Sequence, residues 1–151
     1  MKKVLLVLVA IMGFAFAANA QSNNLGIRFG GGQGYNAELS WQHGLGNNRL
    51  ETDLGWAFYN EASSMSLTCI YQIVLGISNH FAWYIGPGAY IGMSKVDGNS
   101  NFGLAVAGQV GIEYDFNIPL QLSLDIRPRF HVIPSTDFHW GDIALGVRYR
   151  F

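Results

Sequence analysis

One short segment near the C-terminus holds the residue types of an acyl-transfer or hydrolase site. His131, Ser135 and Asp137 could act as base, nucleophile and orienting acid, with His139 and Asp142 close behind. Such a trio activates a serine only when hydrogen bonds join the three side chains. Ser and Asp are also ordinary turn residues, and a proline stands between His131 and Ser135. We therefore predict no catalytic residue and keep this trio as the alternative.

Two other patterns could suggest a bound group. The GGGQG segment at 30–34 resembles a phosphate-binding loop, but it lacks the Lys and the following helix that such a loop needs, so we expect a hairpin turn. The histidines are scattered without metal-ligand spacing. We predict no metal site and no cofactor. The four histidines are His43, His80, His131 and His139.

The elements that would position these residues are strands. In LQLSLDIRPRFHV, residues 120–132, apolar residues or proline alternate with polar and charged ones, which is the period of a β-strand. Similar stretches recur along the chain, separated by turn-type segments, and predict a meander of hairpins. The eight predicted strands are residues 25–31, 35–43, 49–59, 66–77, 81–93, 102–114, 120–132 and 140–151.

The two faces of these strands differ in charge. One face is apolar in every predicted strand, whereas the other collects six basic and seven acidic side chains among many glycines and alanines. The charged face consists of Arg28, Glu38, Arg49, Glu51, Asp53, Glu113, Asp115, Asp125, Arg127, Arg129, Asp142, Arg148 and Arg150.

We expect the charged face to turn inward. The interior of an eight-stranded barrel is only just wide enough to be filled by side chains, so it could not hold all the apolar ones. A charge facing the middle of a bilayer costs about 2–4 kcal/mol, whereas apolar side chains suit lipid. Aromatic residues near both ends of the predicted strands are typical of the two membrane interfaces. The sequence therefore predicts an eight-stranded antiparallel up-and-down transmembrane β-barrel.

Two prolines fit this barrel less well. Pro87 and Pro128 lie inside predicted strands, where each removes a hydrogen-bond donor from the ladder. We expect a bulge or a water molecule at one or both. A bulge at Pro128 would make the inward placement of Arg129 and His131 uncertain.

The N-terminus carries a targeting signal. Lys2 and Lys3 precede an apolar run that ends in Ala18-Asn19-Ala20, so we predict a cleaved signal peptide at 1–20 and a barrel domain at 21–151. The remaining chain has a formal charge of −3, which does not favour nucleic acid. Its single cysteine, Cys69, excludes an internal disulfide.

Several segments resemble one family. NRLETDLGW (48–56), GQVGIEYDFNIPLQLSLDIRP (108–128) and the terminal ALGVRYRF are similar to small outer-membrane β-barrel proteins of Bacteroidetes-type bacteria. The resemblance implies an eight-stranded outer-membrane barrel and attaches no activity to it. The C-terminal Phe151 resembles the usual end of such barrels and implies contact with the barrel-assembly machinery.

The function predicted from the sequence is an integral outer-membrane protein with a structural envelope role. Paired charges would fill its lumen without an open pore. The partners we expect are outer-membrane lipids and no nucleic acid, and we expect a monomer. Two alternatives stay open. One is a lipid A-modifying acyl hydrolase or transferase that uses the last extracellular loop, and the other is a narrow channel or small-ligand binder.

Overall fold

The computed structural model describes residues 22–32, 34–59, 62–141 and 143–151, and the regular elements among them are β-strands. No helix in this part of the chain is long and apolar enough to cross a membrane. The strands are β1 (Asn23–Gly32), β2 (Gly34–Leu45), β3 (Asn48–Tyr59), β4 (Ala62–Gly76), β5 (Phe81–Val96), β6 (Asn99–Asp115), β7 (Leu120–Ile126), β8 (Arg129–Ile133), β9 (Asp137–His139) and β10 (Ile143–Arg150).

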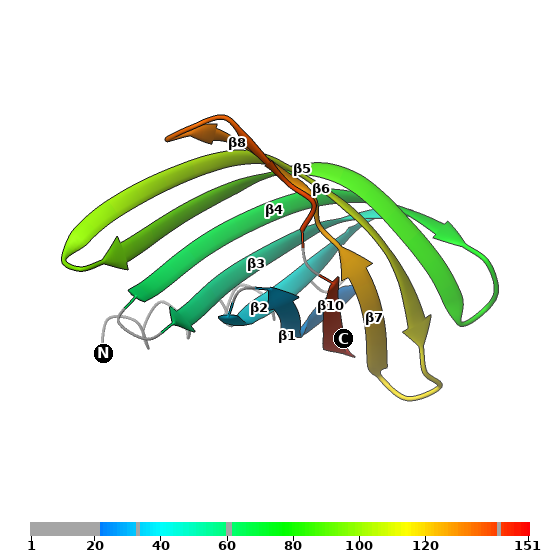
Figure 1. Ribbon diagram of the computed structural model, residues 1–151. Helices are drawn as coiled ribbons and strands as arrows, with labels where there is room; N and C mark the ends of the chain where they lie inside the picture. The colour runs from blue at the N-terminus through cyan, green and yellow to red at the C-terminus, as the bar shows by residue number, and fades with distance from the viewer. Residues whose placement is uncertain (1–21, 33, 60–61, 142) are drawn as a thin grey trace.

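The strands close into a barrel (Figure 1). Antiparallel neighbours follow chain order from β1 to β6, and β10 completes the circuit by pairing with both β7 and β1. β7 and β8 share one position in the wall because both pair with β6. The wall therefore has eight positions, and the predicted eight-stranded antiparallel barrel is confirmed. We call the end with the β1–β2, β3–β4, β5–β6 and β8–β9 connections the distal end, and the other the terminal end.

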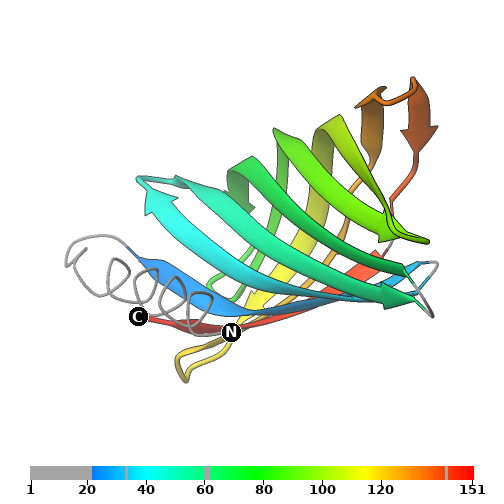
Figure 2. The ribbon, with the colours of Figure 1, turned by 90° about the vertical axis from the view of Figure 1, so that its left-hand side faces the viewer.

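The last two predicted strands are wrong in their bounds. The strand predicted at 120–132 divides at Pro128 into β7 and β8, and β9 forms inside the segment expected to be a loop. β8 and β9 make a hairpin, drawn in orange in Figure 2, in which β8 pairs with β6 and β9 lies on the other side of β8. The last strand begins at Ile143 rather than at 140, because the chain must first return from this hairpin. Gly141 has a φ of 82°, and a Cβ there would overlap the Arg127 carbonyl group, so the return needs glycine.

At Pro128, where a bulge or a water molecule was one expectation, the pairing with β6 shows no bulge. Ile126 pairs with Val110 and Arg129 pairs with Ala107, so the register continues unchanged past the proline. Pro128 still accepts a hydrogen bond from the Gly108 amide at 2.9 Å. The register shift lies farther along β6, between Leu104 and Ala105. Arg129 therefore keeps its inward position.

Pro87 interrupts the ladder without a bulge. Pairing between β4 and β5 runs to Ile70 and Gly88 and resumes at Ile73 and Ile85, in the same register. Pro87 has no amide hydrogen to donate across this gap. On its other side, Pro87 pairs with Gly108 of β6, so the strand remains in the wall.

The polarity of the barrel is inside-out relative to a water-soluble protein. Polar side chains such as Ser40, Glu51 and Gln72 are fully buried, whereas large apolar side chains cover the exterior. The exterior includes aromatic residues of both predicted interfaces: Phe29, Phe81, Trp83, Phe102, Phe130 and Tyr149. An apolar exterior of this extent needs lipid to cover it.

The depth of this lipid-facing belt can be tested on β5. Ala89 lies at mid-strand, and Met93 lies on the same face nearer the distal end; both are exposed. Ala89→Lys should lower the free energy of unfolding in lipid vesicles by about 2–4 kcal/mol, because the ammonium group faces hydrocarbon. Met93→Lys should lower the free energy of unfolding by less than this, since its charge can reach the membrane interface. Equal losses of unfolding free energy for the two variants, measured by urea titration, would contradict the predicted depth of these residues in the membrane.

Candidate functional site

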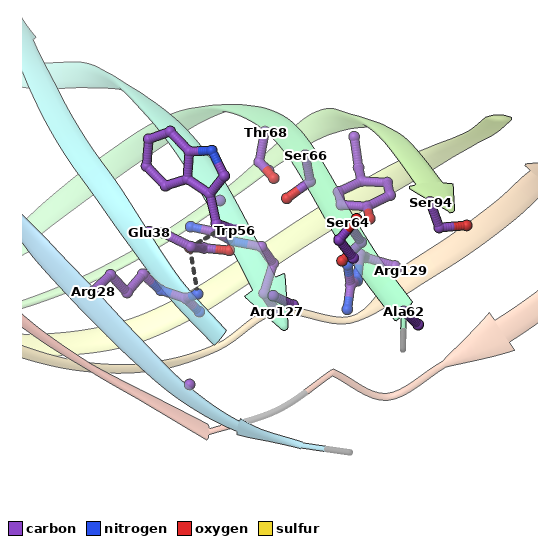
Figure 3. Close-up of a pocket in the computed structure, with 15 residues that line it drawn as sticks. Arg28, Glu38, Trp56, Ala62, Ser64, Ser66, Thr68, Ser94, Arg127 and Arg129 are labelled. Atoms are coloured by element: carbon purple, nitrogen blue, oxygen red, sulfur yellow. Dashed lines mark hydrogen bonds and ion pairs between the residues drawn. The ribbon is translucent and has the colours of Figure 1, made fainter. Parts of the chain in front are cut away.

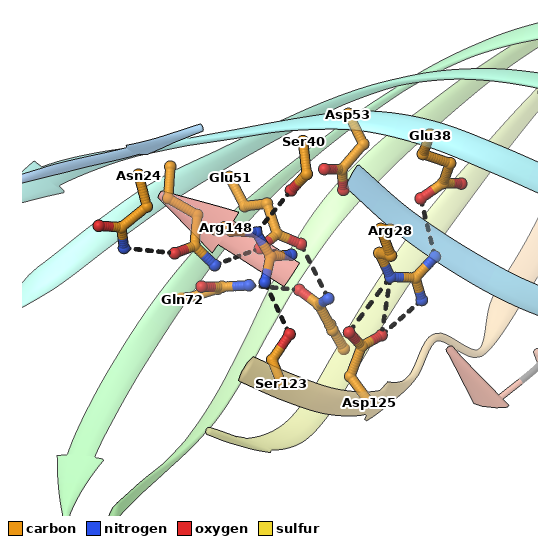
Figure 4. Close-up of polar contacts among 12 residues, drawn as sticks. Asn24, Arg28, Glu38, Ser40, Glu51, Asp53, Gln72, Ser123, Asp125 and Arg148 are labelled. Carbon is orange, nitrogen blue, oxygen red and sulfur yellow. Dashed lines mark hydrogen bonds and ion pairs between the residues drawn. The ribbon is translucent and has the colours of Figure 1, made fainter. Parts of the chain in front are cut away.

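The lumen is crossed by a layer of polar side chains centred on Glu51 (Figure 4). Glu51 accepts hydrogen bonds from Gln42 at 2.6 Å, Gln109 at 2.9 Å, Arg127 at 2.9 Å and Arg148 at 3.0 Å. These residues come from β2, β6, the β7–β8 junction and β10, so they converge from separate parts of the wall. We call these five residues the central layer.

Strand alternation places charges at three levels of the lumen. Arg49, Glu51 and Asp53 occupy successive inward positions of β3, and each side chain is buried. Arg49, nearest the terminal end, forms a bidentate contact with Glu113 and lies 5.0 Å from the centre of the Tyr84 ring. Asp53 accepts a hydrogen bond from Arg127 at 2.5 Å. One strand thus supplies ions that bind partners at different depths.

A second group of ions lies above the central layer, toward the distal end. Arg28 donates to Glu38 from one terminal nitrogen at 2.7 Å and binds Asp125 through its Nε and its other terminal nitrogen. Arg127 also reaches Glu38, at 3.2 Å, and so joins this group to the central layer. The Tyr84 hydroxyl donates to Asp125 at 3.2 Å. Buried ions need such multiple partners because removing them from water is costly.

Glycines make room for the largest lumen side chains. A Cβ on Gly111 would lie 2.5 Å from the Tyr84 ring, and one on Gly146 would lie 2.6 Å from a terminal nitrogen of Arg148. These distances are shorter than van der Waals contact, so an alanine could be accommodated only if Tyr84 or Arg148 moved. The small residues on the inward face are therefore needed for the ions to lie where they do.

The charges predicted to face the lumen fall into four groups. Arg150 and Asp115 form a half-exposed pair at the terminal rim, 3.8 Å apart. Arg129 lies at the distal end and forms no ion pair with a carboxylate among the described residues. Asp142 lies outside the described residues. The others join the buried contacts above: Arg28, Glu38, Arg49, Glu51, Asp53, Glu113, Asp125, Arg127 and Arg148.

The neutral members of this network were not predicted from the sequence. Gln42, Gln72 and Gln109 are fully buried and form a chain of side-chain hydrogen bonds to Glu51. Tyr84 and Tyr90 also point inward and contact arginines. The alternation of the strands could have indicated them, because all five side chains lie at the same alternate positions as the charged residues. The charged face was predicted from charged and small residues alone.

The candidate catalytic residues lie in the β8–β9 hairpin without the contacts of a catalytic site. His131 and Asp137 are register partners, whereas Ser135 is exposed in the turn between the two strands. No hydrogen bond between the described side chains joins the three. The His131 ring instead lies 6.0 Å from the Tyr90 ring, edge to face. The part of the chain that the structure describes also contains no cluster of three potential metal ligands.

Several solved structures have a fold similar to that of this chain. No protein-family model matches the chain, and no curated protein matches it. Among solved structures, it is similar to the N-terminal β-barrel domain of Pseudomonas aeruginosa OprF, with a TM-score of 0.68 and 14% identity over 86% of this chain and 97% of that one. It is also similar to Neisserial surface protein A, with a TM-score of 0.63 and 13% identity over 87% of this chain and 96% of that one. For the Yersinia pestis outer membrane protein Ail, the TM-score is 0.55 and the identity is 14%, over 87% of this chain and 98% of that one. The chain therefore has the fold of a small outer-membrane β-barrel, and its apolar exterior is the surface that this membrane requires.

Proposed function

We propose that this protein is a small integral component of the bacterial outer membrane with a structural envelope role, and that its lumen does not conduct ions. The observation that carries the proposal is the central layer, in which four side chains from different parts of the wall converge on Glu51. An interior of eight strands is narrow enough for such a layer to fill it.

The balance of charge supports the same role. The buried arginines of the lumen bind carboxylates directly, for example Arg148 to Glu51 and Arg49 to Glu113. A conducting pathway for one ion type usually requires a ring of one sign. Here both signs alternate within a few ångströms, which stabilises the barrel rather than a passing ion.

The outer connections support a role within the membrane rather than beyond it. The β5–β6 connection has only two residues between strands, and the β8–β9 connection has three. We infer a monomer of the Bacteroidetes-type family that contacts outer-membrane lipids and, through Phe151, the barrel-assembly machinery. The lipid-modifying alternative lacks a hydrogen bond between Ser135 and His131 to support it.

Conductance tests the proposal directly. The wild-type barrel, inserted into a planar lipid bilayer, should show no discrete current steps because the central layer fills the lumen. A triple variant, Glu51→Ala, Gln109→Ala and Arg148→Ala, should conduct if it inserts, since three of the five side chains are shortened.

The control for this experiment is Ser64→Ala, which changes the distal lumen and leaves the central layer intact. This variant should show no discrete current steps. Regular steps from the wild-type protein would refute the proposal, whatever the triple variant does.

A stability measurement tests the structural role of the same layer. Glu51→Gln keeps the shape of the side chain but removes the carboxylate that Arg148 binds, so an arginine that is fully buried loses its counter-ion. We expect a loss of about 3–5 kcal/mol in the free energy of unfolding in vesicles. Asp115→Asn breaks the half-exposed rim pair and should cost under about 1 kcal/mol. Similar losses for both variants would show that the layer does not stabilise the barrel.

A further inference from the structure

A polar cavity of about 270 Å³ lies in the distal half of the lumen, next to Arg127 of the central layer (Figure 3). We call it the distal cup. One wall is rich in hydroxyl groups: Ser64, Ser66 and Thr68 occupy successive inward positions of β4, and Ser94 faces Ser64 from β5. None of these four hydroxyls forms a side-chain hydrogen bond with another described residue. They are therefore available to a ligand.

Arginines line the other side of the cup. Arg28 and Arg127 already bind the Glu38 carboxylate, which is the acidic group among the described lining residues. Arg129 differs, because no described carboxylate pairs with it. Arg28 also binds Asp125, and Arg127 also binds Glu51 and Asp53. Arg129 is therefore the positive charge of the lining that has no acidic partner among the described residues.

Two buried donors beside the cup lack an acceptor among the described residues. The Nε atoms of Arg127 and Arg129 are both inaccessible and form no hydrogen bond with the described residues. The Arg127 side chain as a whole is only 5% exposed. A buried N–H without an acceptor is unfavourable. Because neither Nε atom is accessible from the cavity, an anion would contact them only after the side chains turned.

Arg129 is held by an aromatic ring in place of a carboxylate. Its guanidinium carbon lies 4.7 Å from the centre of the Tyr90 ring. Tyr90 folds over Gly92, where a Cβ would come within 2.5 Å of the tyrosine oxygen. Stacking orients a guanidinium group and leaves its in-plane N–H donors available. The position of Arg129 is therefore fixed before any ligand binds.

We propose that the distal cup binds a phosphate group. Guanidinium N–H groups and hydroxyls surround the cavity from several strands, which suits an oxyanion with oxygens in several directions better than a planar carboxylate. The volume is near the lower limit of ligand sites, so it fits one small anionic group. With a periplasmic N-terminus, the cup opens at the cell surface. The phosphate could then come from the medium or from a lipid headgroup.

Calorimetry on the purified full barrel tests this site and separates the two sources. In maltoside micelles, which contain no phosphate, the protein is titrated with inorganic phosphate and, separately, with dihexanoyl phosphatidic acid. Heat with either probe supports the site. Binding of phosphatidic acid alone identifies a lipid headgroup, and binding of inorganic phosphate identifies a soluble source. No binding of either probe at millimolar concentration would overturn the proposal.

Arg129→Gln identifies the residue responsible. It should weaken binding at least about tenfold, because hydrogen bonds to a charged group typically contribute such a factor. The matched control is Arg150→Gln, which removes a half-exposed arginine at the terminal rim and should leave the affinity within twofold.

A second variant keeps the test decisive if Arg129→Gln does not fold. Ser64→Ala with Ser66→Ala retains every charge and should weaken binding several-fold. Wild-type affinity in this double variant and in any folded Arg129→Gln protein would overturn the assignment of the site.

Discussion

The structure depends on one constraint: a charged side chain in a transmembrane strand cannot face lipid. Strand alternation offers only two directions, so the charges must point into the lumen and find partners there. Arg28 binds Asp125, which is 97 residues away in the chain, and Arg148 binds Glu51 at the same sequence separation. These contacts across the lumen therefore form only when the barrel has closed. Closure and charge pairing stabilise each other, and both are lost together if the register slips by one residue.

The same constraint determines which small residues the wall contains. Large side chains can turn into a narrow lumen only where their neighbours in the wall are small. Gly111, the cross-strand partner of Tyr84, and Gly146, two residues before Arg148 on β10, provide this room. Glutamines complete the layer because their amide groups both donate and accept. Gln109 donates to Glu51 and accepts from Gln72, and so joins β4 and β6 to the centre. Neutral residues thus connect ions that could not all contact one another directly.

Much of this architecture could be predicted from the sequence, since a period of two can be read locally and charge distinguishes its two faces. The predictions failed where distant segments decide the outcome. Nothing near Pro128 indicates that the register continues past it, because the pairing with β6 supplies that continuity. The late start of β10 likewise depends on the hairpin of β8 and β9 and on a close approach of Gly141 to Arg127. Pairing partners within the lumen could not be predicted either, because they depend on how the two ends of the sheet meet.

The lumen changes character along its axis, and this difference connects the structural role with the proposed site. At the centre, Arg148 and Glu51 satisfy one another, so the layer has no free capacity for a ligand. At the distal end, the barrel leaves Arg129 against Tyr90, with a buried N–H and without a described acidic partner. An unpaired arginine is unfavourable for stability and is retained more easily if it binds something. In the function we propose, the central layer closes the lumen below, so an anion in the cup would be held at the mouth and not passed through. A barrel that does not conduct can therefore still present a selective binding surface.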